Sequence, residues 1–148
     1  MKVSNNYVVL VQESESFVGH PYLDSVGVPT IGYGTTHYPN GKKVSLSDPG
    51  IDKAKAVEYL LYETTQEIEP NLNRMVKVTI NQNQFDALAD FCYNLGWPAL
   101  EKSTLLKKLN AGDFVGAKAE FAKWDKAGGK PLLGLTKRRA KEAALFLP

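Results

Sequence analysis

The chain has 148 residues, a hydrophobic content of 43% and a formal net charge of only +2. This length fits one domain that can bury a substantial core without disulfides or metals. The lone cysteine, Cys92, excludes an internal disulfide, and we expect a buried thiol because Cys92 lies in the apolar run DALADFCYNLG.

The N-terminal segment predicts neither a signal peptide nor a membrane span. Its apolar patch, Val8 to Val11, is too short for either and is followed by acidic residues. We therefore expect a soluble protein that is made and kept in the cytosol.

Positive charge is concentrated near the C-terminus. Residues 101–148 carry 11 Lys and Arg against 5 Asp and Glu, a net charge of +6, whereas residues 1–100 carry 7 against 11, a net charge of −4. This asymmetry is consistent with an anionic partner, for which nucleic acid, a membrane surface and an acidic cell-wall polymer all qualify, or with an ordinary solvated helical surface.

The first predicted elements are a helix and a small sheet. Asn5 or Asn6 can cap a helix through YVVLVQESES that should fail near Gly19 and Pro21. The segments HPYLD, VPTIGYG and KKVSL alternate with turn sequences and predict an antiparallel sheet of two or three strands. Such a sheet needs helices beside it.

Helical patterns cover most of the remaining chain. Asp52 can cap a long helix that Pro70 should end. Further helices are predicted in NQNQFDALADFCYNL, in STLLKKLNAG, in DFVGAKAEFAKW with Asp113 as its cap, and in LTKRRAKEAALF.

These elements predict a single α+β domain over residues 1–148. An N-terminal helix and β lobe would occupy about residues 1–51, a connecting helix about 52–70, and a helical lobe about 71–148. A cleft between the two lobes is the natural place for a ligand.

Three polar side chains should converge beside the predicted hairpin. If SVG is its three-residue loop, Asp24 faces Val28, and Thr30 is the diagonal neighbour of Asp24 on the same face. Glu15, in the last turn of the first helix, can fold back toward them.

Paired carboxylates in a cleft suit glycosidic bond cleavage, in which one donates a proton to the leaving oxygen. We assign Glu15 as the donor because a helix C-terminus and the neighbours Phe17 and Val18 disfavour its ionised form. Asp24 should remain ionised, and the Thr30 hydroxyl could hold a water against it. Capping and turn formation are the structural alternatives, and spacing alone does not separate Glu15 from Glu13.

The stretch ESFVGHPYLDSVGVPTIGYG resembles the active-site signature of the phage-type lysozymes, the endolysins of glycoside hydrolase family 24. In that signature an acid, an aspartate nine residues later and a threonine six further form the catalytic set, which selects Glu15, Asp24 and Thr30. The likeness extends through most of the chain. Two departures are Ser16, where the family often has glycine, and His37, which follows two threonines after TIGYG; both His37 and His20 could simply be exposed.

The resemblance implies a lysozyme-like fold and hydrolysis of the β-1,4 bond between N-acetylmuramic acid and N-acetylglucosamine in peptidoglycan, with inversion at the anomeric carbon. It also implies that an arginine of TKRRAK reaches the acid, and the register from Phe146 favours Arg138 over Arg139. Tyr93, Asn94, Ser103 and Arg138 match stretches that bind substrate, although Tyr93 could be a core residue and Ser103 a helix cap. Trp97 and Trp124 are expected to pack in the interior.

No cofactor or metal is expected, since two histidines and one cysteine show no ligand spacing. The resemblance implies a monomer that binds peptidoglycan, not nucleic acid, and does not insert stably into membranes. It would accumulate in the host cytoplasm and reach the wall through a separate pore, a holin. The alternatives are a lytic transglycosylase, which would not need Asp24, and a non-catalytic cationic module that disrupts walls or membranes.

Overall fold

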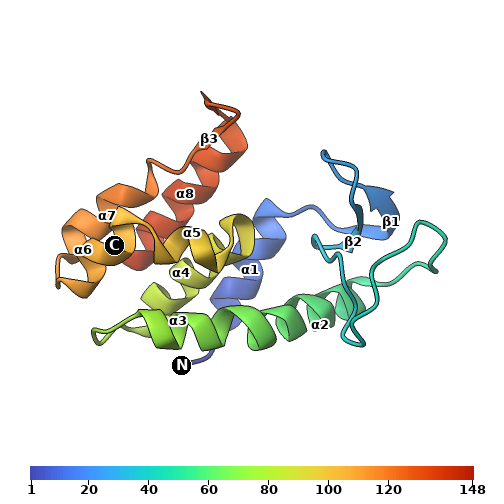
Figure 1. The fold of residues 1–148 in the computed structure, drawn as a ribbon, viewed down its shortest axis with the longest axis horizontal. Helices are drawn as coiled ribbons and strands as arrows, with labels where there is room; N and C mark the ends of the chain where they lie inside the picture. Colours follow the sequence, from blue (N-terminus) through green and yellow to red (C-terminus); the bar gives the residue numbers. More distant parts are fainter.

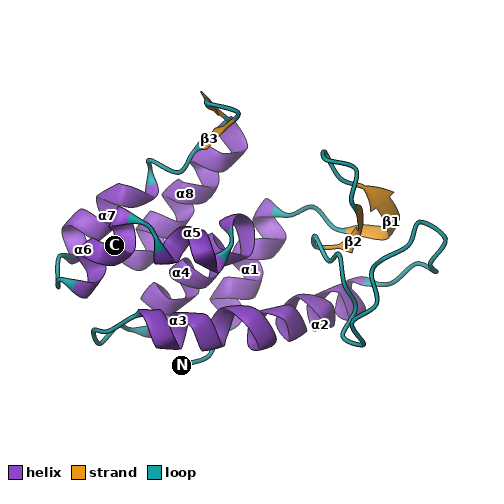
Figure 2. Cartoon of the chain, viewed as in Figure 1, coloured by secondary structure: helices purple, strands orange, loops and turns teal.

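The computed structural model describes residues 1–148 as a helical body with a small β lobe at one end (Figure 1). The elements in chain order are α1 (Asn5–Ser14), β1 (Val18–Leu23), β2 (Pro29–Gly32), α2 (Lys53–Glu63), η1 (Thr64–Ile68), α3 (Glu69–Met75), α4 (Gln82–Leu95), α5 (Trp97–Glu101), α6 (Thr104–Asn110), α7 (Phe114–Phe121), β3 (Lys126–Ala127), β4 (Lys130–Pro131) and α8 (Leu133–Phe146). Helices dominate, as Figure 2 shows, and the predicted mixture of helices with a small antiparallel sheet is confirmed.

Helix α1 packs on the helical body through the apolar stripe that its sequence predicts, and Tyr7, Leu10 and Val11 are buried. Its cap is Ser4, however, and not Asn5 or Asn6. The Ser4 hydroxyl also bonds the carboxylate of Asp86 on α4, so a contact 82 residues away in sequence determines where α1 begins.

The helix also ends earlier than predicted, at Ser14, and Glu15 lies just beyond it in an extended conformation. Gly19 and Pro21, which were expected to stop the helix, belong instead to strand β1. Strand pairing with β2 therefore terminates α1 before those residues are reached.

Strands β1 and β2 form the predicted hairpin, with Tyr22 opposite Thr30 and Leu23 opposite Pro29. The Asp24 amide donates to the Val28 carbonyl at 3.0 Å, which confirms the expected pairing across the SVG loop. A third strand does not form, since KKVSL contributes only an isolated bridge between Lys43 and His37.

The long helix passes through Pro70 and does not end there. Segments α2, η1 and α3 follow one another without a break, and Figure 1 shows them as one rod along the lower edge of the molecule. The π-helical η1 shifts the backbone hydrogen bonds by one residue, which puts Pro70 in the first turn of α3, where a missing N–H is tolerated.

The main core lies within the helical body, where α4 is buried on most of its surface and packs against α1 and α8. The predicted caps Asp52 and Asp113 are confirmed at the starts of α2 and α7, and Asn81 and Ser103 cap α4 and α6 through their side chains. Cys92 is buried as expected, and both tryptophans pack against the core. The short α5 and the β3–β4 hairpin were not predicted from the sequence.

No helix of the fold combines the length and apolar character that crossing a bilayer requires.

Removing the Tyr7 hydroxyl should destabilise the junction of α1 with the long rod. This hydroxyl lies 2.7 Å from Thr64 Oγ1 in the buried π-helical segment. We expect Tyr7→Phe to lower the free energy of unfolding by about 1 kcal/mol in urea titrations. Tyr62→Phe, at an exposed position on α2, is the matched control and should change it by less than about 0.5 kcal/mol. Equal effects of the two changes would contradict this assignment.

Candidate active site

Glu15 stands where the chain leaves α1 for the β lobe. Its backbone N–H donates to the Val11 carbonyl at 2.7 Å, which ties it to the last turn of the helix. Its side chain is 30% exposed, and Oε1 accepts a hydrogen bond from Arg138 Nη1 at 2.9 Å. The arginine expected to reach the acid is therefore Arg138, as predicted.

Glu13, the competing acid, has a different environment. It faces solvent and forms an ion pair with Lys141 at 2.8 Å, both side chains being about half exposed. The two acids are therefore distinguished by their partners, because Glu15 contacts the buried Arg138 and Glu13 does not.

Arg138 is shared between Glu15 and a second, deeply buried carboxylate. Its Nε and Nη2 donate to the two oxygens of Asp90 on α4 at 2.9 and 2.8 Å. Burial disfavours the charged guanidinium, but the hydrogen bonds and charges of Asp90 and then Glu15 outweigh burial and raise the pKa of Arg138. Arg138 is thus a permanent cation whose charge Asp90 already compensates in part.

Asp24 is held by its own turn. Its Oδ1 accepts hydrogen bonds from the backbone N–H groups of Val26 and Val28, both at 2.9 Å. These bonds occupy one oxygen and leave Oδ2 available. Asp24 is only partly buried, so solvent can reach it.

Thr30 lies on the neighbouring strand, and only 3% of its surface is exposed. Its Oγ1 donates to the Val28 carbonyl at 2.8 Å. Because the hydroxyl proton is used in this way, the remaining lone pairs can only accept, for example from a water hydrogen.

Tyr22 pairs with Thr30 across the hairpin. Burial raises the pKa of its phenol, and the charges of Glu15 and then Asp24 raise it further.

The backbone of the TIGYG segment closes around Glu15. Gly34 has φ +91°, and a Cβ there would lie 3.8 Å from Glu15 Oε2 and 3.6 Å from the Tyr93 hydroxyl. The Tyr93 hydroxyl donates to the Tyr33 carbonyl, which ties α4 to this segment. Tyr93 is therefore near the acid as well as packed against the core.

The remaining predicted substrate-binding residues have structural partners. Asn94 accepts a hydrogen bond from Arg139 Nη2 at 2.8 Å and is half-buried. Ser103 is buried, caps α6 and donates to the Leu100 carbonyl at 2.6 Å, so its hydroxyl is fully engaged within the fold. His20 and His37 are both exposed.

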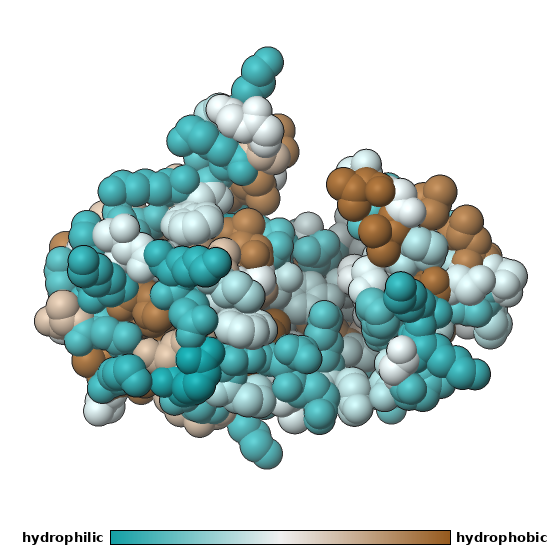
Figure 3. Space-filling view, in the orientation of Figure 1, coloured by the Kyte–Doolittle hydropathy of each residue, from teal (hydrophilic) through white to brown (hydrophobic).

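The molecule is hollowed between the β lobe and the helical body, and Figure 3 shows this notch with apolar side chains on both of its upper rims. The C-terminal end of α1, which precedes Glu15, points toward it in Figure 1. The notch is consistent with the expected position of a ligand cleft.

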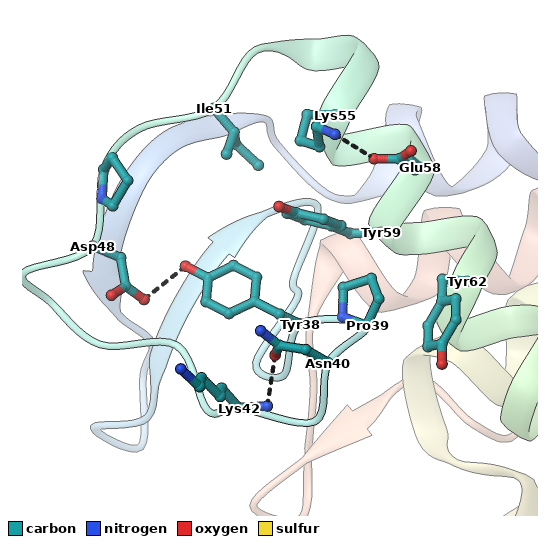
Figure 4. Close-up of a pocket in the computed structure, with 11 residues that line it drawn as sticks. Tyr38, Pro39, Asn40, Lys42, Asp48, Ile51, Lys55, Glu58, Tyr59 and Tyr62 are labelled. Carbon is teal, nitrogen blue, oxygen red and sulfur yellow. Dashed lines mark hydrogen bonds and ion pairs between the residues drawn. The ribbon is translucent and has the colours of Figure 1, made fainter.

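A pocket of about 640 Å³ lies elsewhere, between the loop around Tyr38 and α2, and none of Glu15, Asp24 and Thr30 lines it (Figure 4). The Tyr38 hydroxyl bonds Asp48 at 2.7 Å and its ring meets Tyr59 edge-on, contacts that anchor the loop to the helix. No group of three or more His, Cys, Asp or Glu side chains is arranged to hold a metal ion.

Comparison with known proteins agrees with this arrangement. The profile of the phage lysozyme family matches residues 12–142, from the last turns of α1 to α8. The chain belongs to the phage lysozyme family. The resemblance that the active-site stretch suggested is thereby confirmed.

Relatives and solved structures of this family cover nearly all of the chain. It is 41% identical to the endolysin of Acyrthosiphon pisum secondary endosymbiont phage 1, over 99% of this chain and 98% of that one. It is 49% identical to the endolysin of Bacillus phage B103 over 80% of this chain but only 43% of that longer protein. A crystal structure of a P22 lysozyme mutant, 36% identical, superposes with a TM-score of 0.89 over 100% of this chain and 99% of the other.

Sequence reasoning missed Asp90 and Glu142, the buried acids behind Arg138. Both are fully buried, Asp90 among the apolar residues of α4 and Glu142 on the same buried face of α8 as Arg138 and Arg139. A charged residue on a buried helix face requires a partner, and that was the available signal. Identifying the partner required the contact between α4 and α8.

Removing Arg138 should destabilise the protein far more than removing an exposed cation from the same helix. Arg138→Ala leaves the buried Asp90 carboxylate without its bidentate partner, and we expect a loss of about 3–5 kcal/mol in the free energy of unfolding. The matched control is Lys141→Ala, which breaks the exposed pair with Glu13 and should cost at most about 1 kcal/mol. Denaturant titrations measure both, and similar losses would show that Asp90 does not depend on Arg138.

Proposed function

We propose that this member of the phage lysozyme family is an endolysin that degrades bacterial peptidoglycan as a muramidase. Its substrate bond would be the β-1,4 link between N-acetylmuramic acid and N-acetylglucosamine. The single observation that carries the proposal is that Arg138, anchored to the buried Asp90, holds Glu15 where α1 leads into the hairpin whose turn amides hold Asp24.

Glu15 is the general acid in this proposal. It protonates the glycosidic oxygen as the bond to the anomeric carbon breaks, and its carboxylate is left facing Arg138 Nη1. Asp90 binds the other donors of Arg138 and compensates part of its positive charge. The guanidinium can therefore hold Glu15 in position while stabilising the ionised form of Glu15 less than an uncompensated arginine would.

Asp24 and Thr30 act on the opposite side of the sugar. In this proposal the carboxylate of Asp24 takes a proton from a water through its available oxygen, while Thr30 Oγ1 accepts the other hydrogen of that water. This arrangement gives inversion, for which two carboxyl groups roughly 6.5–9.5 Å apart are needed.

The sugar chain would occupy the notch. Arg138 and Tyr93 frame the acid and are proposed to contact the sugars flanking the cleaved bond, with Asn94 behind Tyr93 on α4. Ser103 would support the same surface through the start of α6, which its hydroxyl caps.

Delivery to the wall would follow from the same function. We propose that the enzyme accumulates as a monomer in the host cytoplasm and reaches peptidoglycan only after a separate holin has permeabilised the membrane. Expression with and without a holin gene tests this, and we expect lysis only with the pore. Lysis without the holin would contradict the proposed route to the wall. A dimer in light-scattering measurements would contradict the proposed monomer.

Replacing the proposed acid should abolish lysis while its exposed neighbour is dispensable. Glu15→Gln removes the donated proton, and we expect the clearing rate of outer-membrane-stripped cells to fall by at least about 100-fold. Asp24→Asn, which retains the turn but not the base, should also be inactive. Glu13→Gln is the matched control and should retain the parent rate. Undiminished lysis by Glu15→Gln would support the non-catalytic cationic module instead.

The products of digested peptidoglycan distinguish hydrolysis from the transglycosylase alternative. A hydrolase adds water and yields reducing N-acetylmuramic acid ends, whereas a transglycosylase forms anhydro-sugars and has no use for Asp24. We expect mass spectrometry to find reducing muropeptides, and NMR of fresh products to find the α anomer that inversion generates from a β bond. Predominant anhydromuropeptides would exclude the proposed reaction.

A further inference from the structure

A second pocket on the β lobe adjoins the proposed base and is not used by the reaction described above. It has a volume of about 330 Å³ and lies between residues 27–29 of the hairpin and residues 36–44 of the loop that follows β2. A space of this size can hold part of a small organic ligand.

Val28 joins this pocket to the proposed catalytic groups. Its N–H donates to Asp24 Oδ1 at 2.9 Å, and its carbonyl accepts from Thr30 Oγ1 at 2.8 Å. Val28 also lines the pocket. A group bound there is therefore next to the place where Asp24 and Thr30 would act on a sugar.

Two side chains that carry nitrogen donors stand side by side at this pocket. His37 and Lys43 are partners in an antiparallel bridge, and the backbone hydrogen bonds on both sides of the pair, each 2.9 Å, belong to the neighbouring residues. In such a non-hydrogen-bonded pair both side chains leave the same face, with Cβ atoms roughly 4.5–5.5 Å apart. The next pair, Tyr38 and Lys42, lines the other pocket, against α2 (Figure 4).

Both side chains have donors available for a ligand. Lys43 is exposed and takes part in none of the ion pairs of the molecule. Thr36 Oγ1 lies 3.1 Å from His37 Nδ1, and when this hydroxyl donates, the ring proton is on Nε2, which faces no protein partner. No Asp or Glu lines the pocket, so its charge favours an anion.

The rest of the pocket is largely apolar. Val44 is buried, Pro29 is half-buried and Val28 is 40% exposed. A ligand that combines an anionic group with short aliphatic groups would match both parts of this lining.

The proposed reaction specifies which part of the substrate lies beside this pocket. The water activated by Asp24 attacks the anomeric carbon of N-acetylmuramic acid, so the sugar next to Asp24 is the one that bears the stem peptide. This peptide is attached through the lactyl group of the sugar and contains free carboxylates and alanine methyl groups. Its chemistry is that of the pocket lining.

We propose that this pocket binds the stem peptide of the substrate. A peptide carboxylate accepts hydrogen bonds from Lys43 and His37, and an alanine methyl group packs on Val28 and Val44. The inference rests on the proposed function and adds to it a preference for glycan strands that carry peptides over bare strands.

Kinetics on two substrates test the role of Lys43. Lys43→Gln removes the cation, and Lys42→Gln removes the neighbouring cation of the other pocket as the matched control. On intact peptidoglycan, Lys43→Gln should raise KM by roughly 3-fold to 10-fold with little change in kcat, because an exposed contact made equally in the ground and transition states is lost. On strands whose stem peptides an amidase has removed, it should match the parent.

Two results of these assays would overturn the proposal. One is an equal rise of KM on intact and peptide-free strands, and the other is a Lys42→Gln enzyme that behaves as Lys43→Gln does. His37→Ala should raise KM on intact strands by less than Lys43→Gln, since a neutral donor binds a carboxylate more weakly than an ammonium does. His37 and Lys43 are both exposed, so the midpoint of unfolding should stay at the parent value in each variant.

Direct binding gives a readout that does not require catalysis. In Glu15→Gln, the free tetrapeptide L-Ala-D-Glu-L-Lys-D-Ala should shift the backbone NMR signals of Val28, His37 and Val44. The shifts should disappear when Lys43→Gln is added or when the carboxylates of the peptide are amidated. Absence of shifts, or equal shifts with inorganic phosphate at the same concentration, would overturn the assignment to a stem peptide.

The parent enzyme separates this inference from the proposed function. Failure of the function appears as a parent that releases no reducing ends from peptidoglycan. Failure of the pocket proposal leaves the rate and products of the parent unchanged, and it appears only in the comparison of Lys43→Gln with Lys42→Gln and in the peptide titration.

Discussion

The ion pair of Arg138 with Asp90 and Glu15 is the interaction on which the rest of the site depends. It joins α8, α4 and the end of α1, and its two contacts span 48 and 123 positions of the chain. A guanidinium presents its donors in a fixed plane, so binding Asp90 through two of them determines where the third points. Because Asp90 is fully buried, this orientation is enclosed in the core.

The two carboxylates of the site are supported by different means. Glu15 depends on the long-range contact with Arg138, whereas Asp24 depends on backbone amides two and four residues away in its own turn. The chain passes directly from α1 into β1 between them. Movement of the β lobe would therefore alter the position of Asp24 relative to Glu15 without breaking the contacts of either side chain.

Local patterns predicted most of the elements, and the errors arose where distant contacts intervened. The hairpin register across the SVG loop was predictable because turn length and strand alternation determine it. Ser4 replaced the expected caps because Asp86 binds it, and Pro70 lies inside the rod because the buried π-helical segment η1 shifts the hydrogen bonds before it. The division of the chain into lobes and the roles of Tyr93, Asn94 and Ser103 stay predictions.

The sequence by itself determined the helices with clear caps and the hairpin, since propensity and turn chemistry are local properties. A family signature, also local, is what proposes the pair Glu15 and Asp24. It also favoured Arg138 over Arg139. Only the tertiary structure decided that Arg138 is shared between Glu15 and Asp90. The contact with Asp90 joins residues 48 positions apart, and the packing of α8 against α4 determines it.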